Sequence, residues 1–532
     1  MTSQQLPQSP SLEHLRKQAK ALLHAAHAQE DTALERFRQL PALSSKTPAE
    51  LVAMRLALHD AQSVIAREYG FTSWKTLAEH VEERTLTFAA AIDEFIRCAS
   101  GHLPERACRL LALHPGIAHA NLYTELLLGD ASAVSARLER DPQAAQRPGG
   151  AQGWEPLLYV CHTCMHEGAP ERATGLVATA RLLLAQGANP NAQYDFKWHR
   201  ELPRTALWAA LCASDHPPLA QVLLENGANP TDGVSIHIAA GNGNLPALEL
   251  LHRFGVNVDG IPGGVPPLRY ILNWGSNETE RLRAVRWLLE HGADPNLPWL
   301  EPGDAPLHVA AQRWGVPMVE LLIKHGADIH QRRSDGRTAY TLAELQGNTD
   351  VAAWLLAHGA KDELSPLERF VAACARGDRA AANSQLQANP NLSRELLPEH
   401  HLALHVPAER GDAEILDMML TFGFDANVKD TEGVTALHKA AMAGRSGTVR
   451  VLLAHGASIN ALDHMFSATP LVWAAEGRSW NNSSGAGVDH VSVARLLIAS
   501  GSSLEWTPPE KAPHPEKGLE QLSALCRAAA QS

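Results

Sequence analysis

The sequence predicts an all-α protein in which pairs of helices stack in a line as a solenoid. One observation is that the word LLxxGAxxN recurs along most of the chain. Another is that a word of the form TPLHxAA precedes most of its copies, at a commonest spacing of about 33 residues. The third is length, because 532 residues far exceed one ordinary globular core. Repetition at a fixed period therefore predicts an array of similar units.

The word LLxxGAxxN marks the end of the second helix in each unit. Glycine readily adopts the left-handed backbone conformation that closes a helix, and asparagine or aspartate then suits a turn. The clearest copies are LLLAQGANPN (182–191), VLLENGANPT (222–231), WLLEHGADPN (287–296), LLIKHGADIH (321–330), WLLAHGAKDE (354–363), MMLTFGFDAN (418–427) and VLLAHGASIN (451–460).

The unit at 433–460 shows how each helix pair is specified. Thr435 is expected to cap the first helix through its hydroxyl. Ala440 and Ala441 are small enough for a neighbouring helix to approach closely, and Gly456 is expected to end the second helix. Leucine and valine side chains fall at helical spacing on one face. One such unit cannot bury enough apolar surface alone, so stacked units must share their faces.

The paired words at this period resemble the ankyrin repeat. The resemblance implies about twelve helix–turn–helix units with short loop or hairpin fingers, from about 88 to 506. Units near 88–153 and at 365–397 diverge from the pattern, and the early ones replace the glycine–alanine ending with HPGIA and DPQAA. Pro407 falls inside a first helix, where it should remove a backbone hydrogen bond and bend the chain.

A small helical module is expected ahead of the array. Ser11 can cap its first helix, and Thr47 with Glu50 has the form of a capping box. We expect the helix that follows Thr47 to run on until near Gly70. Residues 60–82 resemble a module that precedes ankyrin arrays in some bacterial proteins. The remaining predicted segments are a disordered leader (1–10), the module (11–84), a proline-rich connector (507–517) and a C-terminal capping helix (518–532).

The bulk properties limit the class of partner and the compartment. A net charge of −12 argues against nucleic acid, since neutralising phosphates requires a basic face. No apolar stretch approaches about 18 residues, and the start lacks the apolar core of a signal peptide. Seven scattered cysteines form no disulfide framework. We therefore expect a cytoplasmic monomer with reduced thiols and no membrane contact.

Chemistry is suggested most strongly by CHTCMH at 161–166. Cys161, Cys164 and His166 could ligate zinc together with a partner from elsewhere in the chain. Cys161 also aligns with a small core position of the repeat, where cysteine acts as a compact apolar residue. The chain has no nucleophile elbow, Walker glycine loop, H-E-x-x-H or Rossmann fingerprint. We therefore expect no enzyme activity, no catalytic residue, no metal and no cofactor.

The 27 histidines are better explained by the repeat than by catalysis. Those at the fourth position of TPLH can bond to a threonine hydroxyl and to loop backbone. These are His237, His308, His405 and His438.

Tryptophan is unusually frequent, with 12 Trp against 6 Tyr. Trp154, Trp299 and Trp314 fall in loops or near unit junctions. They are either anchors for a protein partner or covers for the insertions.

The resemblance to ankyrin repeats implies that partners bind on the concave face, formed by the fingers and the solvent side of the first helices. Candidate contact residues, carried over by position, are Glu301, Asp304, Gln312, Arg313, Ser334, Asp335, Arg337, Thr431, Glu432, Val434 and Met442.

The leading hypothesis is thus a bacterial scaffold or adaptor that binds a partner protein on this face. The alternative is an enzyme or metal-binding protein with a site around 161–166. Recognition of a basic protein through the acidic net charge is a variant of the leading hypothesis.

Overall fold

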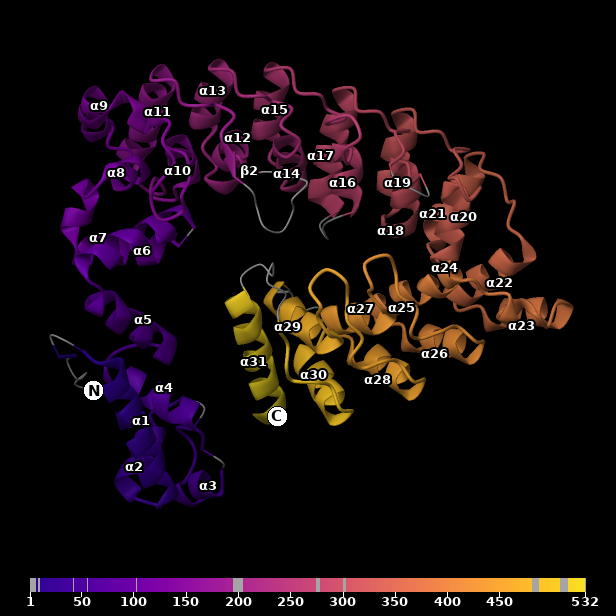
Figure 1. Ribbon diagram of the computed structural model, residues 1–532. Helices are drawn as coiled ribbons and strands as arrows, with labels where there is room; N and C mark the ends of the chain where they lie inside the picture. Colours follow the sequence, from indigo (N-terminus) through magenta and orange to yellow (C-terminus); the bar gives the residue numbers. More distant parts are fainter. Residues whose placement is uncertain are drawn as a thin grey trace. The chain divides into compact units, whose positions relative to one another are not determined.

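The computed structural model describes residues 6–7, 10–41, 43–54, 56–101, 103–194, 204–273, 278–299, 303–480, 488–507 and 515–531. The described part is mostly helical (Figure 1). It divides into two compact units. Unit 1 comprises Met1–Tyr194 and Thr205–Asn229, and unit 2 comprises Asp195–Arg204 and Pro230–Ser532.

Unit 1 begins with five helices that share one hydrophobic core. Ser11 caps the first of them by accepting a hydrogen bond from the His14 amide, as predicted. The predicted capping box of Thr47 and Glu50 is also present. The helices are α1 (Leu12–His27), α2 (Asp31–Phe37), α3 (Pro48–Ala53), α4 (Leu58–Glu68) and α5 (Trp74–Thr85).

The prediction of one continuous helix from Thr47 to near Gly70 is wrong. Helix α3 ends at Ala53, the backbone at Met54 is extended, and α4 begins at Leu58. Five residues along a helix turn through about 140°, so an unbroken helix would direct Leu51 and Leu56 to different sides. The break allows both side chains to be buried in the same core. The Asp60 carboxylate then accepts a hydrogen bond from the Ala57 amide at 2.8 Å and starts α4.

The rest of unit 1 is made of stacked helix pairs and one short two-stranded sheet. Helices α6, α8 and α10 pack in succession, and α9 packs against α11. The elements are α6 (Phe88–Ser100), α7 (Pro104–Leu113), η1 (Pro115–His119), α8 (Leu122–Leu128), α9 (Ala131–Arg140), η2 (Pro142–Ala145), α10 (Pro156–His162), α11 (Pro170–Ala185), β1 (Gln193–Tyr194), β2 (Arg204–Thr205), α12 (Ala206–Trp208), η3 (Ala209–Ala213) and α13 (Pro217–Glu225).

Unit 2 continues the pattern of paired helices. Its elements are α14 (Ser235–Gly241), α15 (Leu245–Arg253), α16 (Pro267–Asn273), α17 (Glu278–Glu290), α18 (Pro306–Arg313), α19 (Val316–Lys324), α20 (Ala339–Leu345), α21 (Thr349–Ala357), α22 (Pro366–Ala375), α23 (Arg379–Ala388), η4 (Leu392–Arg394), α24 (Pro398–His401), η5 (Leu402–Leu404), α25 (His405–Arg410), α26 (Ala413–Thr421), α27 (Ala436–Met442), α28 (Ser446–Ala454), α29 (Pro470–Trp480), α30 (His490–Ala499) and α31 (Pro515–Gln531).

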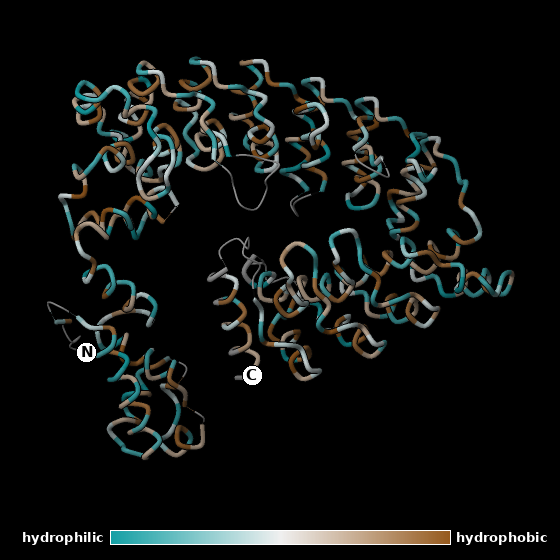
Figure 2. The backbone as a smooth tube through the Cα atoms, viewed as in Figure 1, coloured by the Kyte–Doolittle hydropathy of each residue, from teal (hydrophilic) through white to brown (hydrophobic). Residues whose placement is uncertain are grey.

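Stacking of these pairs forms the core of unit 2. The first helices α14, α16, α18 and α20 pack one on the next, as do the second helices α17, α19 and α21. Hydrophobic and hydrophilic stretches alternate along the helices, so each helix can bury one side (Figure 2). Gly456 ends α28 with a left-handed φ of 78°, as predicted. The predicted all-α solenoid is therefore confirmed.

The first helix α27 is capped by a histidine ring, and this differs from the prediction. The Thr435 amide donates to Nδ1 of His438 at 3.2 Å, so the ring and not the threonine hydroxyl caps the helix. Since Nδ1 accepts, Nε2 carries the proton and donates to the Ala468 carbonyl at 3.1 Å. The predicted hydroxyl and backbone partners of this ring are both present, because Thr435 Oγ1 lies 2.9 Å from Nδ1.

His405 does not hold the fourth position of the TPLH word, which the sequence predicts for it. The first helix of its unit begins earlier, at Pro398, and Nδ1 of His400 accepts from the Leu397 amide at 3.1 Å. The 3₁₀ turn η5 separates α24 from α25, in agreement with the predicted effect of Pro407. Pro407 has no N–H to donate to the Ala403 carbonyl, and it lies in the first turn of α25, where a helix needs no such hydrogen bond.

No helix within the described ranges has both the length and the apolar character needed to cross a membrane.

Candidate protein-binding surface

Short hairpin loops, the fingers, precede several first helices of unit 2. In the finger at 332–338, residues Arg332 and Thr338 form an isolated β-bridge, and the Arg333 amide donates to the Arg337 carbonyl at 3.0 Å. Gly336 adopts a φ of 82° at its tip, which few other residues tolerate. A second finger is closed by the bridge between Trp299 and Asp304. The fingers are therefore fixed by their own backbone.

A third finger, at 430–434, is organised by one carboxylate. Asp430 Oδ1 accepts hydrogen bonds from the amides of Glu432 and Val434, both at 2.9 Å. This arrangement turns the Thr431 and Glu432 side chains to solvent and buries Val434, which is 1% exposed. Thr431 and Glu432 therefore remain accessible to a partner, whereas Val434 belongs to the core.

A chain of alternating arginines and carboxylates links successive fingers. Asp304 lies 3.7 Å from Arg269 and 3.1 Å from Arg333. Arg333 Nη2 lies 3.0 Å from Asp335, whose carboxylate is 3.4 Å from Arg337 Nη1. We call the side chains of Arg269, Asp304, Arg333, Asp335, Arg337 and Glu368 the finger ladder.

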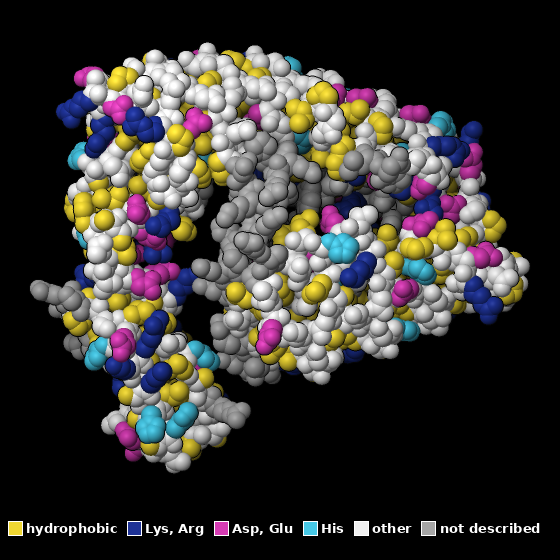
Figure 3. Space-filling model, viewed as in Figure 1, with side chains coloured by type: hydrophobic (Ala, Val, Ile, Leu, Met, Phe, Trp, Pro, Cys, Tyr) yellow, Lys and Arg dark blue, Asp and Glu magenta, His cyan; other side chains and the backbone are white. Residues whose placement is uncertain are grey.

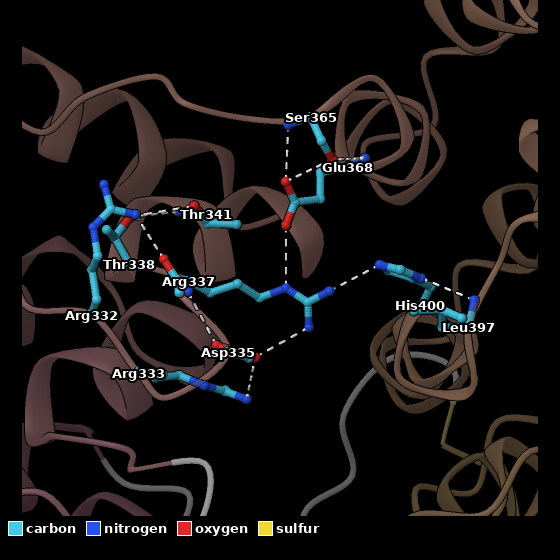
Figure 4. A network of polar contacts seen from close by, with 11 residues as sticks. Arg332, Arg333, Asp335, Arg337, Thr338, Thr341, Ser365, Glu368, Leu397 and His400 are labelled. Carbon is cyan, nitrogen blue, oxygen red and sulfur yellow. Dashed lines mark hydrogen bonds and ion pairs between the residues drawn. The ribbon is translucent and has the colours of Figure 1, made fainter.

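Arg337 is the centre of the contacts drawn in Figure 4. Its Nε donates to Glu368 Oε1 at 3.2 Å. Burial raises the pKa of Glu368, but hydrogen bonds from Ser365 and from Arg337 outweigh it, so this pKa lies below its ordinary value. Arg337 thus stabilises a half-buried carboxylate on the next repeat.

Arg337 also approaches His400, with Nη2 at 2.9 Å from Nε2 (Figure 4). A neutral imidazole has one acceptor nitrogen, and the Leu397 amide already donates to Nδ1. The ring therefore cannot accept from both donors. Burial, and then the positive charge of Arg337, lower the pKa of His400. At His400, the two N–H donors, from Arg337 and Leu397, therefore outnumber the single acceptor nitrogen of the ring.

A family model described as ankyrin repeats matches three stretches of the chain, residues 272–365, 370–463 and 404–507. The chain is an ankyrin-repeat protein. The matched stretches include all three fingers and most of the finger ladder.

Curated ankyrin proteins from other organisms resemble the chain over part of its length. Mouse Rabankyrin-5 is 27% identical over 220 residues, which cover 38% of this chain and 19% of that protein. Human transient receptor potential cation channel subfamily A member 1 is 23% identical over 333 residues, covering 52% of this chain and 27% of the channel. The chain thus spans about a quarter or less of these relatives' length.

Among solved structures, the human ASB11 ankyrin repeat domain is similar, with 25% identity and a TM-score of 0.34. The match covers 46% of this chain and 99% of that domain.

Two neighbouring ankyrin fingers hold five of the candidates predicted from the sequence. Trp299 and Asp304 belong to one finger, and Ser334, Asp335 and Arg337 to the next. Ser334 and Asp335 are exposed, whereas Trp299, Asp304 and Arg337 are half-buried within or beside the finger ladder. Glu301 lies outside the described residues.

The candidates on the first ankyrin helices are divided between surface and core. Arg313, the last residue of α18, is exposed, while Gln312 and Met442 are half-buried. Trp314 is 8% exposed, and its Nε1 donates to the Leu272 carbonyl at 2.8 Å. Trp314 is therefore a packing residue between repeats, and it offers no accessible anchor.

Trp154, in unit 1, packs within an aromatic group. Its ring stacks on Tyr194 with centroids 4.5 Å apart and lies 4.8 Å from the ring of His162. The ring of Tyr159 belongs to the same group, with its centroid 5.5 Å from that of Trp154. These contacts place Trp154 as a cover over the first helix α10.

The cysteines at 161–166 are buried thiols. Burial raises the pKa of Cys161, and raises that of Cys164 to about 11. Cys164 Sγ donates to the Ala99 carbonyl at 3.2 Å, and Nδ1 of His166 lies 3.1 Å from the Thr163 carbonyl. Metal ligation requires thiolates. In the ranges that the structure describes, no group of three or more His, Cys, Asp or Glu side chains is placed to hold a metal ion.

The sequence did not indicate several members of the finger ladder, nor His400, which contacts the ladder at Arg337. Arg269 follows Pro266-Pro267-Leu268, so it stands where other repeats have the TPLH histidine. That substitution was a detectable departure from the repeat pattern. His400 occupies the same position in the word LPEH, which its neighbour LALH obscured. Arg333 and Glu368 gave no comparable indication.

Proposed function

We propose that the chain is a scaffold or adaptor that binds a partner protein along the fingers and inner face of the ankyrin array in unit 2. The observation that carries this proposal is the combination of rigid fingers with exposed tips. Backbone hydrogen bonds fix the fingers at 332–338 and 430–434, while Ser334, Asp335, Thr431 and Glu432 face solvent.

Rigidity of this kind favours binding. A surface that is already ordered loses little conformational entropy when a partner docks, so more of the contact energy appears as affinity. The side chains of Ser334, Thr431 and Glu432 lie outside the core, so their residue types are available to match a partner. Ankyrin repeats in general imply protein partners, and the finger edge is where this chain offers accessible polar side chains.

A matched pair of variants tests the surface. Arg313→Glu with Glu432→Lys changes two exposed residues on the inner and finger side without changing net charge. Glu320→Lys with Lys324→Glu makes the same exchange on the second helix α19, where both side chains are exposed. Partner capture from the protein's own cells is measured by cross-linking and quantitative mass spectrometry, with melting temperature as the folding control.

We expect the first pair to reduce capture at least about tenfold, which corresponds to about 1.4 kcal/mol of binding free energy. The α19 pair should leave capture unchanged. Equal capture by both pairs, with intact melting curves, would rule out the finger side as the binding surface.

We also propose that the chain acts without catalysis, as a monomer in a reducing cytoplasm. Free cysteines in the core and at the surface, where Cys108 is exposed, support the reducing compartment. A bacterial origin rests on the resemblance at residues 60–82. Light scattering coupled to size-exclusion chromatography tests the monomer, and a dimer mass would contradict it.

A further inference from the structure

Three cationic side chains and one histidine gather on the inner side of unit 2. They are Arg269 on α16, Arg313 at the end of α18, His405 at the start of α25 and Lys439 on α27. We call them the inner basic face. Figure 3 shows positively and negatively charged side chains in small groups on the face that it draws.

Arg269 has unused hydrogen-bond donors although it is buried. Its side chain is 10% exposed, and its Nε and Nη1 have no hydrogen-bond partner among the residues that the structure describes. The guanidinium lies 4.8 Å over the Trp299 ring, which holds it in place. Unpaired buried donors are costly, so their retention indicates an acceptor that arrives from outside.

Arg313 adds an accessible charge next to Arg269. It is exposed, and its Nη1 donates to a neutral group, the Asn273 carbonyl, at 3.3 Å. After burial and the opposing effect of Asp304, the charge of Arg313 lowers the pKa of Arg269. The two guanidinium groups therefore contribute to one positive region.

Lys439, on helix α27, adds a further positive charge to this region. Its Nζ lies 5.9 Å from the Trp473 ring centre. Burial, and then the charge of Lys439, lower the pKa of His405 to about 4, with further contributions from His438 and Arg313 and an opposing one from Asp430. Charges from α18 and α27 thus act on the same ring. Within the described part of the chain, Nε2 of His405 also has no hydrogen-bond partner.

The two carboxylates that act on Arg269 and His405 also contact other groups. Asp304 is shared with Arg333 at 3.1 Å, and Asp430 accepts from two amides of its own finger. Over the residues that the structure describes, neither Arg313 nor Lys439 forms an ion pair with a carboxylate. The inner basic face therefore has an excess of positive charge and of donors.

We propose that the inner basic face receives carboxylate side chains from an acidic segment of the partner protein. The proposal rests on the function proposed above and specifies the chemistry of the partner. Although the net charge of −12 favours basic partners at long range, local complementarity decides which side chains can dock. Arginine binds carboxylates through two parallel N–H donors, which suits a glutamate or an aspartate here.

The test uses a fluorescein-labelled peptide of alternating glutamate and serine, with lysine–serine and serine-only peptides as comparisons. Binding to the full chain is followed by fluorescence polarisation at low ionic strength. The test variant is Arg313→Glu with Lys439→Glu. The matched control is Lys324→Glu with Arg450→Glu, which makes the same charge change at exposed positions on the second helices α19 and α28.

We expect the glutamate peptide to bind the wild-type chain, and the inner variant to weaken that binding at least about tenfold. The outer variant should weaken it less than about twofold. Equal weakening by the two variants, or no preference for the glutamate peptide, would overturn the inference. Capture of the partner protein by the Arg313→Glu, Glu432→Lys double variant is a separate measurement from peptide binding. If capture is lost but the peptide does not bind, the acidic-segment inference fails and the scaffold function stands.

Discussion

Arg337 and His400 lie 63 residues apart in the sequence, yet Nη2 of the arginine is 2.9 Å from Nε2 of the histidine. The same guanidinium donates to Glu368 and lies beside Asp335. One side chain thus connects a finger with the two following repeats, 365–397 and the one that begins at Pro398. The divergent repeat at 365–397 is held in the array partly by this contact.

Replacing Arg337 should destabilise unit 2. Arg337→Gln leaves the half-buried Glu368 without its charged partner, and we expect a loss of about 2–3 kcal/mol. The control is Arg332→Gln on the same finger, where the arginine and its partner Glu363 are both largely exposed. That variant should lose less than about 1 kcal/mol. Urea denaturation measures both, and equal losses would contradict the role given to Arg337.

A buried carboxylate joins the N-terminal module to the first repeat of unit 1. Glu83 on α5 is 0% exposed and lies 2.8 Å from Arg109 and 3.6 Å from Arg106, both on α7. Because Glu83→Gln leaves two arginines without their shared partner, we expect a loss of about 3 kcal/mol.

The neighbouring Glu82 is exposed, so Glu82→Gln is the matched control. It should change stability by less than about 0.5 kcal/mol. Hydrogen exchange at α5 and α7 gives a second readout, since protection of both helices should fall in the Glu83 variant alone. Unchanged protection would show that the module does not depend on this carboxylate.

Two glycines of one repeat should respond oppositely to alanine. Gly456 ends α28 with a φ of 78°, so Gly456→Ala forces a strained backbone and should cost about 1 kcal/mol. Gly447 lies inside α28, and a Cβ there would meet Ala413 at an ordinary 3.9 Å. Gly447→Ala should therefore stabilise by up to about 1 kcal/mol. Thermal unfolding measures the change in stability of each variant. Stability changes of the same sign in the two variants would contradict the roles given to these glycines.

Acid should destabilise unit 2 through its buried histidines. Burial is the first cause that lowers the pKa of His237, His308, His405 and His438. The unfolded chain then binds more protons than the folded one, so stability present above about pH 6.5 is lost as the pH falls toward 4.

The histidine contribution is isolated by His438→Gln, with the exposed His464→Gln as control. The free energy of unfolding is measured against pH for each variant. The slope between pH 6.5 and 4 should decrease for His438→Gln and remain for His464→Gln. An unaltered slope in the His438 variant would contradict this account.

The buried thiols at 161–166 should not hold zinc. Protein purified without chelator is expected to contain less than stoichiometric zinc by elemental analysis, because Cys161 and Cys164 are protonated in the core. One zinc per chain that is lost in Cys164→Ser would favour the metal-binding alternative.

The sequence alone determined the repeat, because its causes are local. Helix periodicity, Gly456 as a left-handed helix end and Ser11 as a cap all depend on residues a few positions apart. The interruption before Pro407 belongs to the same class, since proline lacks the N–H that a continuous helix would need at that position. The fingers at 332–338 and 430–434 were also predictable, as short turns between recurring words.

Only the tertiary structure decided which of these residues act together. Burial of Trp314 and Val434, the break between α3 and α4, and the choice of His400 over His405 as the capping ring depend on neighbours from other repeats. The approach of Arg337 to His400 and the effect of Arg313 on His405 depend on how repeats stack. Electrostatic contacts of this kind follow distance in space, and a repeat pattern specifies only distance along the chain.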